Sequence, residues 1–282
     1  MAEKGKRIGY VDHELENFHS NVYLKILRGE LKDRGFEVAG CTATNKETGK
    51  AWAAKNQVPW FDSVAAMNDH VDCYAVLAPG NPETHLALCE QTFPFRKTTY
   101  VDKTFAPNTA TAKNIFALAK KHKVAMQTSS ALRYTAVQAF AREVGRENVR
   151  HMVAWGPGRS FGEYAIHPVE MVVSCMGAEA VGLMRRGTGN QSQLLVNFTG
   201  DRTAVINVYI SAKTPYAASV TTDAETRYFA ADTGRIFVDM AIAFLELFAS
   251  GTPNIPPEET LAIMRILDAA ADPRALKRFV SL

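Results

Sequence analysis

Short apolar runs alternate with amphipathic helical patterns through the first half of the chain. The apolar runs predict strands at 7–11, 36–41, 71–77, 98–101 and 124–128. Apolar residues at helical spacing predict helices at 21–34, 47–56 and 109–122, and Asn81-Pro82-Glu83 opens one more. Strands separated by helices imply right-handed crossovers and a parallel sheet covered on both faces. We therefore expect residues 1–130 to form a doubly wound, Rossmann-type nucleotide-binding domain.

The pattern changes after a predicted helix at 131–144. Six β-rich runs follow, several joined by Gly, Asn or Asp turns, at 149–155, 181–186, 193–199, 204–211, 217–222 and 227–231. Two helices close the chain, one at 236–249 and one that begins at Pro257. Residues 131–282 are therefore expected to form an α+β domain with a mostly antiparallel open sheet. Together the two halves give an α/β protein of two domains.

Composition and charge narrow the classes of partner. The chain has 282 residues, of which 47% are apolar and 22% charged, which is the balance of a globular protein with a full core. This excludes a disordered or fibrous chain. The net charge is only +3 and is spread along the sequence, so nucleic acid and anionic membrane are not expected as partners.

The cysteines and the first residues of the chain indicate the cellular compartment of the protein. No C-x-x-C spacing occurs, and the cysteines lie mostly in apolar runs, as buried free thiols do (Cys41, Cys73, Cys89 and Cys175). Residues 1–7 are charged almost at once, which argues against a signal peptide. Asp239 and Glu246 interrupt the best candidate for a membrane-spanning helix. We expect a cytoplasmic protein.

Ligands of an open parallel sheet bind beyond the carboxyl ends of its strands. A dinucleotide-binding sheet normally carries G-x-G-x-x-G after the first strand, but this chain reads Gly9-Tyr10-Val11-Asp12-His13-Glu14-Leu15-Glu16 there. Each carboxylate near a pyrophosphate would repel it by about 1 kcal/mol, whereas a helix dipole returns only about 0.3 to 1 kcal/mol. Either this loop disfavours standard cofactor docking, or it is a solvated acidic loop that points away.

The end of the second predicted strand offers Thr44, Asn45 and Lys46 in place of the acid that usually holds the ribose of NAD. These residues either accept the 2′-phosphate of NADP, which favours NADP slightly, or form an ordinary polar turn. The third strand end continues into the loop from Ala78 to Asn81.

Two residues suggest proton chemistry. Lys103 directly follows an apolar strand, at the edge where it can exchange a proton with a substrate hydroxyl, although an exposed lysine is the commoner case. His167 lies in the polar cluster Gly162 to Glu170 and can take a hydroxyl proton while a carboxylate orients its ring. The alternative is a hydrogen-bonded structural histidine.

Metal ligation is the third possibility. His167 and Glu170 are three residues apart, and the first loop holds Asp12, His13, Glu14, Glu16 and His19. Such ligands suit zinc or manganese, but their spacing matches no closed site. We therefore expect no metal.

Several motifs together resemble the Gfo/Idh/MocA oxidoreductases, named for glucose-fructose oxidoreductase and inositol dehydrogenase. The family's Pro-containing loop with a downstream His is matched by Ala78-Pro79-Gly80-Asn81-Pro82-Glu83-Thr84-His85. Its Glu-Lys-Pro motif corresponds to Asp102-Lys103-Thr104, and its Arg-aromatic pair to Arg133-Tyr134. Its Asp-x-Gly-x-His motif corresponds to Glu163-Tyr164-Ala165-Ile166-His167. The resemblance spans nearly the whole chain.

The resemblance implies NAD(P)-linked oxidation or reduction of a sugar or polyol, in a homodimer or homotetramer built through the C-terminal sheet. In that reading Lys103 holds and polarises the reacting oxygen, His167 is the acid/base, and Glu163 supports His167. Strand ends and resemblance together give the expected cofactor-binding residues Gly9, Asp12, His13, Thr44, Asn45, Pro79, Asn81, His85 and Lys103. Arg133, Tyr134 and Glu170 are expected to bind the substrate.

This chain departs from the family pattern at the glycine loop, at Thr104 and at Glu163. We expect an NAD(P)-dependent oxidoreductase in which Lys103 and His167 face one shared cleft. The alternatives are a sugar-binding protein or a lyase-like or hydratase-like enzyme that works without a free dinucleotide, and a regulatory or structural subunit.

Overall fold

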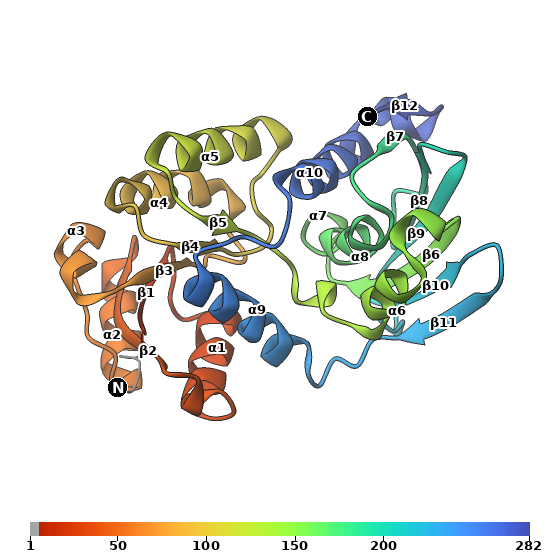
Figure 1. The fold of residues 1–282 in the computed structure, drawn as a ribbon. Coiled ribbons are helices and arrows are strands. Elements are labelled where there is room, and N and C mark those ends of the chain that lie inside the picture. Colours follow the sequence, from red (N-terminus) through yellow and green to blue (C-terminus); the bar gives the residue numbers. More distant parts are fainter. Residues whose placement is uncertain (1–5) are drawn as a thin grey trace. The chain divides into compact units, whose positions relative to one another are not determined.

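A computed structural model describes residues 6–282 (Figure 1). The chain forms two compact units, and each unit contains two separate segments of the sequence. One unit runs to Ser129 and also includes Phe237–Pro256; the other is Ser130–Ile236 with Pro257–Leu282. The segment 237–256, expected in the second domain, thus packs in the first. Residues 1–5, most of the charged start that argues against a signal peptide, lie outside the described residues.

The first unit is built on a five-stranded parallel sheet in the order β2-β1-β3-β4-β5. Its strands are β1 (Lys6–Asp12), β2 (Phe36–Ala43), β3 (Cys73–Val76), β4 (Thr99–Val101) and β5 (Met126–Gln127). Its helices are α1 (Phe18–Arg28), α2 (Lys46–Asn56), α3 (Val64–Met67), α4 (His85–Thr92), α5 (Thr109–His122) and α9 (Ile236–Ser250). The predicted alternation of strand and helix is confirmed.

Helix α1 begins and ends earlier than the pattern predicts. Asn17 caps its start, because the Asn17 side chain accepts hydrogen bonds from the backbone N–H groups of His19 and Ser20. The helix ends at Gly29, and the rest of the predicted helix is a short 3-10 turn that closes at Gly35 with φ +73°. Glycine suits that position because it carries no Cβ.

Helix α9 completes the core of the first unit. The Phe244 ring stacks on Tyr100 at 5.3 Å between centroids and meets the ring of Tyr23 edge-on, also at 5.3 Å. All three rings are at most 2% exposed. A fully buried aromatic side chain contributes roughly 1.5 to 3 kcal/mol, so the late helix is an integral part of the early sheet's core.

The second unit carries a seven-stranded sheet in the order β11-β10-β6-β9-β8-β7-β12. Its strands are β6 (His151–Gly158), β7 (Ala180–Arg186), β8 (Gln191–Phe198), β9 (Arg202–Ile210), β10 (Ala217–Thr221), β11 (Thr226–Ala230) and β12 (Val280–Ser281). Only the β6–β9 pair is parallel among these paired strands. The mostly antiparallel sheet is confirmed, and β12 is an addition.

Helices cover one face of this sheet: α8 (Ile166–Met176) packs on β6 and β9, α10 (Pro257–Ala271) on β7 and α8, and α6 (Ala136–Val144) on α8. Helix α6 starts five residues later than predicted because Thr135 and Gln138 form a capping box. Helix α8 begins at Ile166, with Pro168 in its first turn, where a missing N–H costs nothing. His167 and Glu170 therefore lie on a helix.

Candidate active-site residues in the two units

Asp102 and Lys103 lie at the carboxyl end of β4, as expected. The Asp102 side chain is fully buried, and its Oδ1 accepts hydrogen bonds from the Lys103 backbone N–H at 2.8 Å and the Tyr100 hydroxyl at 2.9 Å. The Lys103 ammonium donates to the Pro79 carbonyl at 3.4 Å, and the Lys103–Thr104 peptide is cis. A half-buried ammonium thus lies at the edge of a parallel sheet where ligands bind.

The turn after β1 runs from Asp12 to Asn17, and it corrects the expectation for Gly9. Gly9 lies inside β1, where a Cβ would meet Met67, Val71 and Tyr74 at 3.0 to 3.2 Å, so its role is packing. Laid on the turn, the G-x-G-x-x-G spacing falls on Asp12, Glu14 and Asn17. The fingerprint therefore loses all three glycines.

Asp12 stabilises this turn through hydrogen bonds to its side chain. The Asp12 carboxylate is fully buried and accepts hydrogen bonds from the Glu14 backbone N–H at 3.1 Å and the Asn17 amide at 2.9 Å. Burial raises the pKa of Asp12 to about 7, although these donors oppose the shift. Asp12 is thus committed to the turn.

Glu14 reaches across to the next strand end. Its carboxylate accepts a hydrogen bond from the Asn45 amide at 3.0 Å and from the Thr48 hydroxyl at 2.7 Å, at the start of α2. Exposed Thr44 donates its backbone N–H to the Asp12 carbonyl, and Asn45 donates its own to the carbonyl of half-buried His13. A negative charge therefore occupies the strand end where we expected the 2′-phosphate of NADP.

The loop after β3 contains the strained residue Ala78, which has φ +55° and is buried. Backbone strain of this kind in a non-glycine residue clusters at functional sites. Half-buried Asn81 donates its side-chain amide to Glu83 at 3.1 Å and does not cap the helix. His85 is fully buried, and its two ring nitrogens lie 2.6 and 3.0 Å from the carbonyl oxygens of Leu77 and Phe105. His85 holds this loop through these two contacts, and its expected contact with a cofactor stays a prediction.

His167 lies in the first turn of α8 in the second unit. Its Nδ1 is 2.7 Å from the Ser130 hydroxyl, and the rings of Tyr164 and Tyr216 meet the imidazole edge-on. The backbone N–H of Ser130 donates to Glu170 at 2.7 Å. Burial raises the pKa of Tyr216 to about 12, so this phenol stays protonated. The imidazole is thereby oriented by a serine.

Glu163 does not support His167 in this structure. It is exposed on α7 (Phe161–Tyr164), and its carboxylate accepts from the Ser160 hydroxyl at 3.1 Å. The short helix α7 directs the Glu163 side chain to the cap of its own helix, and the expected support of His167 stays a prediction.

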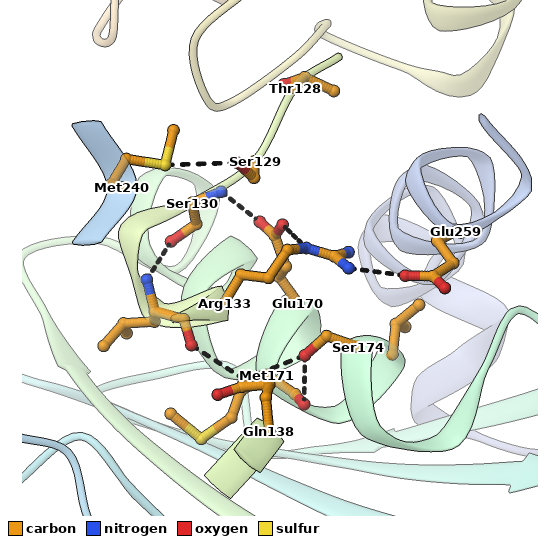
Figure 2. Close-up of polar contacts among 12 residues, drawn as sticks. Thr128, Ser129, Ser130, Arg133, Gln138, Glu170, Met171, Ser174, Met240 and Glu259 are labelled. Carbon is orange, nitrogen blue, oxygen red and sulfur yellow. Dashed lines mark hydrogen bonds and ion pairs between the residues drawn. The ribbon is translucent and has the colours of Figure 1, made fainter. Parts of the chain in front are cut away.

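Arg133 and Glu170, expected to bind substrate, belong instead to a buried ion network (Figure 2). Arg133 donates to Glu170 at 2.8 Å and to Glu259 at 2.7 Å, and Glu259 also accepts from Arg146 at 2.8 Å. Burial raises the pKa of Glu170, with Arg133 opposing. Tyr134, the next residue after Arg133, is half-buried. The network ties α10 to α8 and to the segment that carries Ser130.

The family comparison covers the first unit. Residues 17–130 match the model of an oxidoreductase family with an NAD-binding Rossmann fold, the Gfo/Idh/MocA family. The match places residues 17–130 of the first unit with the NAD-binding domain of that family. The match begins at Asn17, so it leaves out β1 and most of the altered turn.

The first turn of this unit lacks two of the free N–H donors that usually hold a pyrophosphate. A dinucleotide phosphate normally accepts hydrogen bonds from N–H groups at the start of the first helix. Here the Asn17 side chain occupies two of them, those of His19 and Ser20, and the Glu14 carboxylate is fixed at the start of α2.

Solved structures share the fold across the full chain. A myo-inositol dehydrogenase from Lactobacillus casei, in complex with NAD(H) and myo-inositol, is 14% identical with a TM-score of 0.80, covering 99% of this chain and 97% of that chain. A myo-inositol 2-dehydrogenase from Lactobacillus plantarum is 11% identical, with a TM-score of 0.82 and coverage of 99% and 100%. A UDP-N-acetylglucosamine 3-dehydrogenase from Acidithiobacillus ferrooxidans is 15% identical, with a TM-score of 0.75 and coverage of 94% and 95%. No curated protein matches the chain in sequence.

Sequence reasoning missed Ser130, the partner of His167, and the pairing of His19 with Asp102 at 2.5 Å. A small polar residue after a strand carries no spacing signal, and His19 and Asp102 are 83 positions apart. Across residues 6–282 no group of three or more potential ligands is placed to hold a metal, and no helix is long and apolar enough to cross a membrane.

Proposed function

We propose that this protein is an NAD(P)-linked oxidoreductase acting on a small polyhydroxylated compound of the sugar or polyol class. The observation that carries the proposal is the place of Lys103, two residues after β4 and next to buried Asp102, in a unit that matches the family's NAD-binding fold. The inositol and sugar-nucleotide dehydrogenases with the same fold support the substrate class.

The proposed roles follow from the chemistry of the two side chains. The Lys103 ammonium donates a hydrogen bond to the reacting oxygen and stabilises its negative charge as the proton leaves. His167 takes that proton, with Ser130 holding the ring through Nδ1. Arg133 and Glu170 act on Ser130 and α8 and do not touch the substrate. That Lys103 and His167 serve the same hydroxyl stays a prediction.

The open face of the second sheet supports a homodimer or homotetramer. The face opposite the helices carries Val153, Val205 and Leu195 side by side across three strands, with Trp155 next along β6. These side chains are half-buried in one chain, and a second copy would cover them. Sedimentation would show a dimer that Val205→Glu converts to monomer.

A reducing, cytoplasmic setting is also proposed. The cysteines are all free and buried. Burial raises the pKa of the Cys41 and Cys175 thiols to about 12, so both stay protonated.

Calorimetry and thermal unfolding with NADH and NADPH test the proposed function. A ligand at 100 times its Kd adds about 2.7 kcal/mol to the free energy of unfolding. We expect heat and protection with at least one dinucleotide at millimolar concentration, and oxidation of myo-inositol or a related polyol. No heat and no protection with either dinucleotide would overturn the proposal, and the reading without a free cofactor would then stand.

A further inference from the structure

His19 and Asp102 form a buried acid–imidazole pair in the first unit. The Nδ1 of His19 lies 2.5 Å from the Oδ2 of Asp102, and the His19 side chain is only 10% exposed. The pair lies at the carboxyl end of β4, one residue before Lys103. No motif of the family resemblance includes His19.

The hydrogen bonds of Asp102 decide which nitrogen of His19 carries a proton. Oδ1 accepts from two donors, the Tyr100 hydroxyl and the Lys103 backbone N–H, which leaves Oδ2 for the imidazole. Burial favours the neutral acid, but contact with His19 and Lys103 outweighs it and holds the pKa of Asp102 below its ordinary value. An ionised carboxylate only accepts, so Nδ1 of His19 is the donor in this pair, and Nε2 is the ring nitrogen that Asp102 leaves unbound.

The altered first turn fixes His19 in this place. Asp12 binds the Asn17 amide, and the Asn17 oxygen accepts the His19 backbone N–H at 2.9 Å. The imidazole also meets the rings of Tyr23 and Phe237 edge-on, each at 5.6 Å. The residues at the lost glycine positions thus build the first turn of α1 that carries the imidazole.

The Nε2 of His19 is available to a ligand. Among residues 6–282, His19 makes hydrogen bonds through its backbone N–H and its Nδ1. Its Nε2 is not one of the fully buried polar atoms that lack a partner, so this atom keeps some exposure. A neutral imidazole whose Nδ1–H is held by a carboxylate is an oriented proton acceptor at Nε2.

We propose that His19, oriented by Asp102, is a second proton-accepting residue of this protein, whose Nε2 accepts the hydrogen bond of a hydroxyl on a polyol ligand. This rests on the proposed function for the class of ligand only. Asp102 and Asn17 are positioning residues. The step moves no electrons: the hydroxyl proton is shared with, or passes to, Nε2, and Asp102 stabilises the imidazolium that forms.

The geometry predicts what Asp102→Asn does. The amide oxygen of the substituted side chain would take the place of Oδ1, where Tyr100 and Lys103 both donate, and its NH2 would then face the Nδ1 of His19. That forces the proton of the neutral ring onto Nε2 and removes the acceptor without changing the shape of the site. In catalytic triads the same kind of change costs about 10⁴ in turnover. Tyr100→Phe is the matched control, because the Lys103 N–H still holds Oδ1.

Two measurements on the full chain without ligand test the pair. In ¹⁵N NMR of labelled imidazoles, assigned with His19→Asn, we expect His19 of the wild type and of Tyr100→Phe to carry its proton on Nδ1, and His19 of Asp102→Asn to carry it on Nε2. Diethylpyrocarbonate should acylate His19 at Nε2 at least tenfold faster than His85, whose ring nitrogens both face carbonyl oxygens. Asp102→Asn should slow that reaction at least tenfold. A proton on Nε2 in the wild type, or equal reactivity of His19 and His85, would overturn the proposal.

The ligand part is tested with myo-inositol. Addition of saturating myo-inositol should slow acylation of His19 at least threefold and leave His151, on the second sheet, unchanged. No slowing at a concentration that supports turnover would overturn the ligand role. If the NMR and acylation results are as expected but no dinucleotide-linked turnover of any polyol occurs, the proposed function fails and the acid–imidazole pair stands.

Discussion

The Ser130 hydroxyl lies 2.7 Å from the Nδ1 of His167, and the Ser130 backbone N–H is held by Glu170 at the same distance. Ser130→Ala should therefore lower kcat about 10- to 100-fold with little change in KM, because the imidazole loses its orientation. Ser130→Thr, which keeps the hydroxyl, should restore most of the rate. Steady-state kinetics check this, with Ser160→Ala, which removes the N-cap of α7, as the control. An equal loss in the Thr variant would show that packing alone matters.

Lys103→Met and His167→Asn should each reduce kcat/KM by about 10² to 10⁴. If the two side chains serve one hydroxyl, the double variant should be little worse than the poorer single variant, because residues that act as a unit are not additive. Circular dichroism checks that each variant is folded. Multiplicative losses in the double variant would mean that the two residues act in separate steps.

Asp12 should make stability fall with rising pH. Burial raises the pKa of Asp12 from 3.8 to about 7. Its contribution is therefore fully present below the unfolded pKa and is lost as pH rises through the folded pKa. In Asp12→Asn that loss is absent, so the stability of the wild type relative to the variant should decline between about pH 4 and 7, by at most on the order of 4 kcal/mol. Urea unfolding across this range measures it, and a pH-independent difference would contradict the shift.

Glu259→Gln should destabilise the second unit strongly. Glu259 is 4% exposed and holds both Arg133 and Arg146, so the change leaves buried positive charge uncompensated. The expected loss is about 3 kcal/mol or more. Asp223→Asn, in an exposed pair with Arg150, should leave the unfolding midpoint nearly unchanged. Similar midpoints for the two variants would mean that the network contributes no more than a surface pair.

Glu14→Ser should strengthen dinucleotide binding. Loss of one carboxylate near a phosphate is worth roughly 1 kcal/mol, or about fivefold in Kd, and the gain should be larger for NADPH, whose 2′-phosphate adds charge. Isothermal titration of both cofactors checks this. Glu16→Gln is the control, because Glu16 already pairs with Lys55 at 3.1 Å on the surface. Unchanged affinity in Glu14→Ser would remove the argument from repulsion.

Most of the architecture could be read from periodicity, because the strands of the first sheet are continuous apolar runs and those of the second alternate. The two-residue strand β12 could not, since its pairing with β7 depends on a distant partner. The predicted helix boundaries were wrong where a side chain outside the periodic pattern caps the helix, as Asn17 does for α1.

The candidate site was harder to predict than the fold. Lys103 stood out because a strand end fixes its place. Arg133 and Glu170 look like ligand-binding residues in the sequence, yet each finds its counter-ion elsewhere in the fold, and nothing local reveals that Glu259 supplies the missing charge. Pairings across many residues, such as His19 with Asp102, follow only from strand order and helix position.

The return of α9 to the first unit has a consequence for biosynthesis. A ribosome that has made the first 129 residues has delivered all five strands of the parallel sheet but not Phe244, whose ring covers Tyr23 and Tyr100. The core of the first unit can therefore be completed only after more than a hundred further residues have been synthesised. Most of the second unit is thus synthesised before the chain of the first unit is complete.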